Sequence, residues 1–118
     1  MISVLPADER QTAALMAESG VETSAEALIM TDGSHDVGYA LFWVDGDGLR
    51  LLDLRAKEEP LREALLRAAL NVGQARGAAK AVCGLAVLSP MLTSNGFVKN
   101  DKDWRVSIRE FFNISCCH

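Results

Sequence analysis

Three short segments of the 118-residue chain carry side chains that could do chemistry. The C-terminal run Cys116-Cys117-His118 offers soft ligands for zinc or copper, or two thiols for redox chemistry. Zinc sites usually separate their cysteines by about two to four residues, so a plain tail is the alternative. Further ligands would have to come from Cys83 or His35, whose distance from the tail the sequence does not give. We therefore predict no metal site.

The other two segments are turns in the middle of the chain. His35 stands beside Asp36 and could act as a base, but a solvated turn histidine is the commoner case. The run Asp45-Gly46-Asp47-Gly48 has the acidic alternation of a calcium loop. However, Leu49 stands where the next ligand would be and no glutamate closes the loop. We predict a hairpin turn there.

Composition limits the class of protein. Hydrophobic residues make up 49% of the chain and charged residues 24%, which suits one folded domain over residues 1–118. A net charge of −4 with scattered lysines and arginines argues against a nucleic-acid partner. No apolar run approaches the roughly 20 residues of a membrane span, and the acidic N-terminus does not look like a signal peptide. These features, with three cysteines that make no disulfide framework, predict a cytoplasmic protein without membrane partners.

The elements that must position any site begin with an antiparallel meander. Alternation and turn signals predict strands and one early helix: strands at Met1–Leu5, Ala25–Met30, Val37–Val44 and Leu49–Leu54, with a helix that opens after Pro6 and Asp8 and ends at Gly20. In the strand Leu49–Leu54, apolar residues occur at positions that would face both sides of the sheet. We predict that both of its faces are covered, with a β-bulge as the alternative.

The second half begins with a long helix. Apolar residues recur at helical spacing over Leu61–Arg76, and Gly77 is a fitting stop. The rest is predicted as a strand at Ala81–Cys83, a short helix within Leu85–Ser94, strands at Phe97–Lys99 and Arg105–Ile108, and Arg109–Phe112 continuing the last strand. A strand after a helix implies a crossover connection. Trp104, Phe111 and Phe112 are expected in the core, with an exposed patch for a partner as the alternative.

This order, β-α-β-β-β-α-β-α-β-β, resembles that of the GNAT (GCN5-related N-acetyltransferase) superfamily, an α/β (α+β) fold with a mixed, mainly antiparallel sheet. Local motifs agree with the resemblance: the hairpin Leu41–Leu54, the helix Leu65-Leu66-Arg67-Ala68-Ala69-Leu70 closing at Arg76-Gly77, and the pair Gly96-Phe97. The resemblance implies transfer of an acetyl group from acetyl-CoA to an amine. It also implies cofactor-binding residues on the strand and loop before the long helix and in the first turn of that helix: Leu52, Leu54, Arg55, Ala56 and Arg62.

The chain departs from the family pattern at two places. The segment Arg55–Ala64, where a glycine-rich loop would hold the pyrophosphate, contains no glycine, and Pro60 removes an N–H donor. Glu58 and Glu59 add negative charge there. Leu92 stands where the family often has a tyrosine as general acid, so that role is vacant and no catalytic residue is assigned. Tyr39, the one tyrosine, lies on a middle strand and is expected to be a packed core ring. We therefore predict weak or absent acetyl-CoA activity, or alternatively a non-catalytic module that binds a protein partner or forms a homodimer.

Overall fold

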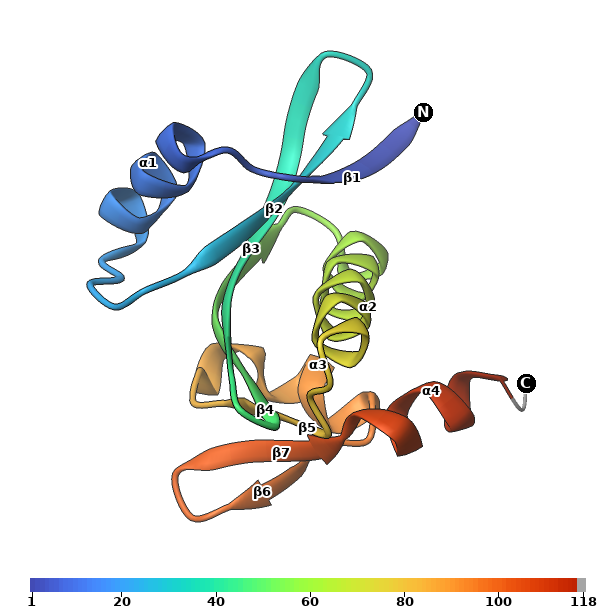
Figure 1. Cartoon of the computed structure of the whole chain (residues 1–118). Helices are drawn as coiled ribbons and strands as arrows, with labels where there is room; N and C mark the ends of the chain where they lie inside the picture. Colours follow the sequence, from blue (N-terminus) through green and yellow to red (C-terminus); the bar gives the residue numbers. More distant parts are fainter. Residues whose placement is uncertain (117–118) are drawn as a thin grey trace.

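The computed structural model describes residues 1–116, which form one seven-stranded sheet with helices on both faces (Figure 1). The strand order is β1-β2-β3-β4-β5-β7-β6. The strands are β1 (Ile2–Pro6), β2 (Glu26–Asp32), β3 (His35–Asp45), β4 (Gly48–Ala56), β5 (Lys80–Cys83), β6 (Val98–Asn100) and β7 (Asp103–Ser107). Neighbouring strands are antiparallel except β4 and β5, which are parallel. This confirms the predicted mixed, mainly antiparallel fold class.

Residues 1–116 contain four α-helices, and the first three lie close to where the sequence predicts. They are α1 (Glu9–Ser19), α2 (Glu59–Ala75), α3 (Ser89–Ser94) and α4 (Ile108–Cys116), with a 3₁₀ turn η1 (Ala86–Leu88) before α3. Helix α1 starts with a capping box, in which Asp8 and Gln11 each accept the other's backbone N–H. It ends at Gly20, whose φ of 74° suits glycine. Within residues 1–116, no helix is long and apolar enough to span a membrane.

The two longer helices lie on opposite faces of the sheet (Figure 1). Helix α2 buries one stripe of side chains against β3 and β4, at the spacing expected of a helix packed on a sheet. The stripe consists of Leu65, Leu66, Ala69 and Leu70. Helix α1 contacts β2 and β3 from the other side and has no fully buried residue. The main core therefore lies on the α2 face.

The aromatic residues of the C-terminal region complete this core. Trp104 and Phe111 are buried and Phe112 is packed against them, as the sequence predicts. The guanidinium of Arg67 on α2 lies 5.6 Å from the centre of the Phe111 ring, which adds a cation–π contact between α2 and α4. These side chains fix α4 against the principal helix.

Helix α4 corrects the prediction that Arg109–Phe112 continues the last strand. The strand ends at Ser107, whose Oγ accepts a 3.3 Å hydrogen bond from the backbone N–H of Glu110 and so caps the new helix. Ile108 and Phe111 are three residues apart and both buried, which is helical spacing. A segment this short has no distinct period in the sequence, and packing against α2 decides its structure.

Candidate functional site

Strands β4 and β5 run side by side for four residue pairs and then diverge. Pairing extends from Gly48–Lys80 to Leu51–Cys83. After Cys83 the chain leaves the sheet towards η1 and α3, whereas β4 continues to Ala56 with β3 on one side. In the described part of the chain, the other edge of β4 has no strand partner beyond Leu51.

A β-bulge lies where this divergence begins. The register of β3 with β4 shifts between Leu51 and Asp53, so that Leu52 has no partner on β3. Leu51 and Leu54 consequently lie in the same core although three positions separate them. The prediction that both faces of this strand are covered is not needed to explain its leucine pattern. The bulge, its alternative, accounts for the pattern, and half-buried Leu52 lies outside the core cluster.

The divergence opens a cleft of about 580 Å³ between β4, the start of α2 and the η1–α3 segment. Its lining residues are Asp53, Leu54, Arg55 and Ala56 on β4, Glu59 and Arg62 on α2, and Val87, Leu88, Pro90 and Met91 on η1 and α3. Four of the five residues predicted to hold acetyl-CoA thus surround one cavity: Leu54, Arg55, Ala56 and Arg62. Leu52, the fifth, lines a different cavity.

The start of α2 forms one end of this cleft and offers few backbone donors. Its N-cap residue, Glu58, makes no side-chain capping hydrogen bond, and its carbonyl accepts from the N–H groups of Leu61 and Arg62. Pro60 has no N–H. The guanidinium of Arg62 donates to the Ala56 carbonyl at 2.9 Å, which ties this side chain to the end of β4. The helix start is therefore poorly equipped to hold a diphosphate through backbone amides.

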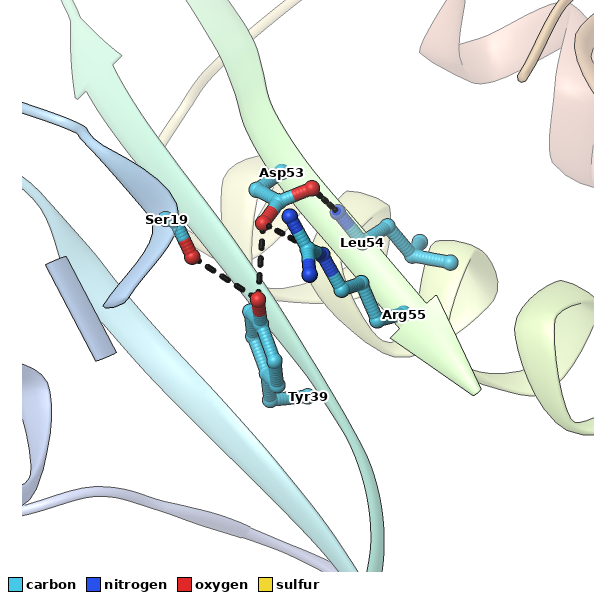
Figure 2. A network of polar contacts seen from close by, with 5 residues as sticks. All are labelled: Ser19, Tyr39, Asp53, Leu54 and Arg55. Carbon is cyan, nitrogen blue, oxygen red and sulfur yellow. Dashed lines mark hydrogen bonds and ion pairs between the residues drawn. The ribbon is translucent and has the colours of Figure 1, made fainter. Parts of the chain in front are cut away.

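Tyr39 belongs to a hydrogen-bonded network at the edge of the cleft (Figure 2). Its hydroxyl donates to Asp53 Oδ2 at 2.7 Å and shares a 2.8 Å hydrogen bond with Ser19 Oγ at the end of α1. Arg55 Nε lies 3.2 Å from the same carboxylate oxygen. The backbone N–H of Leu54 donates to the other oxygen, Asp53 Oδ1, at 2.9 Å. The four side chains join α1, β3 and β4 at the place where the cleft begins.

This environment keeps the tyrosine neutral. Burial is the largest effect and raises the pKa of Tyr39; the Ser19 hydrogen bond opposes the rise and Asp53 adds to it. The prediction of a packed core ring was therefore incomplete, because Tyr39 is half-buried with a fully engaged hydroxyl. Its hydrogen-bond partners come from separate elements, so no local sequence pattern predicts the network.

The positions next to the cleft supply little acid–base chemistry. Leu92, at the site of the family's general acid, is fully buried in the core rather than lining the cleft. The thiol of Cys83 is also buried, and burial raises its pKa, so it stays protonated and unreactive. The ionisable residues that line the cleft are Asp53, Glu59, Arg55 and Arg62.

The other candidates from the sequence lie apart from this cleft. His35 is exposed at the start of β3, as predicted. Asp45 and Gly48 pair across the predicted hairpin turn, where Gly46 has a φ of 61°. Within the described residues, no three His, Cys, Asp or Glu side chains are grouped to hold a metal ion. Cys117 and His118 lie outside the described residues, so the chemistry suggested for the run Cys116-Cys117-His118 stays a prediction.

Comparison with known proteins finds similarity in structure alone. No protein-family model and no curated protein sequence matches the chain. The ribosomal-protein-S18-alanine N-acetyltransferase of Escherichia coli superposes with a TM-score of 0.72 at 14% identity, over 92% of this chain and 94% of that one. A GNAT family acetyltransferase of Brucella melitensis in complex with acetyl-CoA gives 0.65 at 13% identity, over 91% and 88%. The toxin AtaT bound to the C-terminus of the antitoxin AtaR gives 0.68 at 12% identity, over 98% and 97%.

The chain therefore has the fold of the GNAT acetyltransferases, as the sequence predicts. At these identities the likeness defines the fold, and the chemistry must be argued from the site.

Proposed function

We propose that the chain binds the pantetheine arm of an acyl-CoA thioester in the cleft beside β4 and acts as a weak acyltransferase. One observation carries this proposal: within the described residues, the edge of β4 away from β3 has no strand partner from Leu52 to Ala56 and borders an open cleft. A pantetheine arm contains two amide groups and can pair with an unpaired strand edge as a further strand would. The complex of the Brucella protein with acetyl-CoA supports the choice of ligand.

The cleft walls favour the arm over the nucleotide end of the cofactor. Val87, Leu88 and Met91 provide an apolar wall for the methylene groups of the arm. The diphosphate end would meet exposed Glu58 and Glu59 and the donor-poor start of α2. Repulsion between like charges and the shortage of backbone donors both weaken that contact. The nucleotide should therefore add little affinity.

The same geometry explains why turnover should be slow. Acyl transfer to an amine requires a group that removes the amine proton and a group that protonates the leaving thiolate. Asp53 is the strand carboxylate at the cleft, yet it already accepts bonds from Tyr39, Arg55 and the Leu54 N–H. Leu92 cannot donate a proton. Without a positioned acid we expect slow turnover, since a general acid typically contributes about 10²–10⁴-fold.

An NMR titration tests the proposal. Acetyl-CoA and acetyl-pantetheine should both shift the backbone amides of Leu54 and Ala56, with affinities within about threefold of each other, because an ungripped diphosphate adds under 1 kcal/mol. No shift of these amides by either ligand at millimolar concentration would refute binding in the cleft. Acetyl-CoA binding more than about tenfold tighter would instead show that the phosphates are held.

A matched pair of valines provides the control. Val87 on the cleft wall is 85% exposed and Val98 on the outer strand β6 is 69% exposed, so neither supports the core. Val87→Asp should weaken acetyl-pantetheine binding severalfold by placing a charge against the apolar arm. Val98→Asp should leave the affinity unchanged. Equal effects of the two variants on affinity would contradict binding of acetyl-pantetheine in the cleft beside Val87.

A second candidate function is a protein-binding or dimerisation module. Strand β1 is an outer strand of the sheet, and its Ile2 and Leu5 are exposed. An outer strand with exposed apolar residues can pair with a strand of another chain. The AtaT toxin, which shares the fold, is bound to a segment of its antitoxin. This function needs no coenzyme and is tested by the oligomeric state.

A further inference from the structure

A row of side chains crosses the sheet on the face opposite α2. The strand registers place Trp43 beside Arg50, Arg50 beside Val82, and Val82 beside Arg105. The row thus runs over four neighbouring strands, β3, β4, β5 and β7. None of its members belongs to the main core cluster, and Trp43 remains 40% exposed. We call these four residues the arginine row, and none of them lines the cleft beside β4, the proposed donor cleft.

The arginine row lies in a cavity of about 620 Å³. Besides the row, its charged lining residues are Lys80 on β5 and the turn residues Asp45 and Asp47. The two carboxylates belong to the β3–β4 hairpin, whereas Arg50 and Arg105 lie farther along the sheet. The hairpin end of the cavity therefore has two carboxylates close to Lys80, which pairs with Gly48, and the middle of the cavity is basic.

The two guanidinium groups differ in their partners. Arg105 Nε pairs with Asp103 Oδ1 at 3.0 Å. Arg50 is exposed and makes no side-chain hydrogen bond or ion pair within the described residues. A planar guanidinium presents a fork of donors that matches a carboxylate. With an indole on one side and Val82 on the other, Arg50 is suited to hold an anionic group against an apolar floor.

Adjacent residues of β4 line this cavity and the donor cleft. Leu52, the bulge residue, lines the cavity of the arginine row, and the next residue, Asp53, lines the donor cleft. Arg50 precedes Leu52 by two positions, which corresponds to roughly 7 Å along a strand. An anion held at Arg50 would therefore lie about one dipeptide length from Leu52 and Asp53, the neighbouring residues that line the two cavities.

We propose that the arginine row binds the carboxylate of the acyl acceptor, an amine that carries a carboxylate roughly 7 Å away. This inference rests on the proposed function, since it supplies the acceptor for the same cleft. The acceptor amine lies beside Leu52 and Asp53, and its carboxylate pairs with Arg50. A peptide N-terminus with an acidic second residue has this spacing. Lysine-rich acceptors are disfavoured, because their charge would lie against Arg50 and Arg105.

The test uses three dipeptide amides: glycyl-glutamate, glycyl-glutamine and glycyl-lysine. The amide ends remove the terminal carboxylate, so the side chain is the one group that differs. Glycyl-glutamate should shift the backbone amides of Arg50, Val82 and Arg105 in NMR spectra and perturb Trp43 fluorescence. It should bind roughly tenfold more tightly than glycyl-glutamine, the factor typical of a charge-assisted hydrogen bond. Equal binding of the two would overturn the proposal.

Two arginine variants provide the control. Arg50→Gln should weaken glycyl-glutamate binding roughly tenfold and leave glycyl-glutamine binding unchanged. Arg109→Gln makes the same charge change at an exposed position on α4, and it should have no effect. An equal loss of affinity in both variants would show that the effect depends on net charge alone, and it would overturn the proposal.

The donor titration separates this inference from the proposed function. Shifts at Leu54 and Ala56 with acetyl-pantetheine, without any response to glycyl-glutamate, would overturn the acceptor assignment alone. Binding of glycyl-glutamate without any donor binding would overturn the acceptor role, because no acyl group would be available.

Discussion

The carboxylate of Asp53 accepts from groups on two strands: the Tyr39 hydroxyl, Arg55 Nε and the Leu54 N–H. A half-buried carboxylate needs such partners, because burial without them is costly. The Leu54 N–H already donates to Asp53 Oδ1, so a ligand group that accepts from this N–H must displace the Asp53 contact. At the scale of single residues, the site is therefore partly occupied by its own side chains.

Tyr39→Phe should change how the free energy of unfolding depends on pH, because it removes the Tyr39 hydroxyl. Tyr39 has a raised pKa in the folded protein, so its contribution is fully present below about pH 10 and is lost as the pH rises through the folded value. Because Tyr39 is the one tyrosine, wild type should lose more stability than Tyr39→Phe between about pH 9 and 11. Near neutral pH the variant should be less stable by about 1 kcal/mol. Urea unfolding measures both, and parallel pH profiles would contradict the assignment.

Local sequence signals predicted the individual residues at turns and caps but none of the residues in this network. Asp8 and Gly20 bound α1 as expected, because capping depends on neighbours a few positions away. Ser19, Tyr39 and Asp53 meet through the fold, from α1, β3 and β4, and their spacing in the sequence carries no period. Tyr39 was therefore predicted as a packed ring without its hydrogen-bond partners.

At the scale of elements, the packing of β3, β4 and α2 depends on Gly38. A Cβ atom there would lie 2.7 Å from the Arg55 carbonyl oxygen and 2.9 Å from Ala56 Cβ. Leu65 Cδ1 of α2 would be 3.0 Å away. The missing side chain lets the end of β4, which borders the donor cleft, lie close under α2.

Gly38→Ala should therefore destabilise the protein by about 1–3 kcal/mol, since β4 or α2 must move to admit the methyl group. Gly84→Ala is the matched control: a Cβ at Gly84 meets nothing within 4 Å, so stability should change little. Thermal or urea unfolding of the two variants measures the difference. Equal stabilities would show that the packing around Gly38 yields without cost.

Element order was predictable from the sequence, whereas two local structures were not. The long helix, the hairpins and the crossover each have a strong periodic or turn signal. The bulge at Leu52 was an alternative rather than the preferred interpretation, because the leucine pattern fits either geometry. Helix α4 was predicted as strand because its buried face is defined by α2, a partner distant in sequence.

At the scale of the whole molecule, the sheet ends in two outer strands, β1 and β6. The second candidate function predicts a dimer through β1, where Leu5 is 61% exposed. Leu5→Lys should then convert the dimer to a monomer, because a charge on an outer strand opposes strand pairing. Val98→Lys, on β6, should leave it dimeric. Light scattering at several concentrations measures the mass, and a wild-type monomer throughout would exclude this dimer.

The position of the cavity beside β4 could be predicted, but its shape could not. The resemblance pointed to the end of β4 and the start of α2, and Leu54, Arg55, Ala56 and Arg62 do lie around one cavity. Its opening depends on how early β5 ends and where η1 and α3 then pack. The arginine row was missed because register across four strands is a long-range property that alternation within one strand does not reveal.

Four residue pairs between β4 and β5 are the whole seam that joins β1–β4 to β5–β7 within the described sheet. Because so few strand pairs connect them, we expect the two parts to bend relative to each other more easily than strands within one part. A ligand bound between β4 and α3 would contact both parts of the sheet region and restrict their relative bending. We therefore expect ligand binding in the cleft to make the protein stiffer without refolding of any backbone segment.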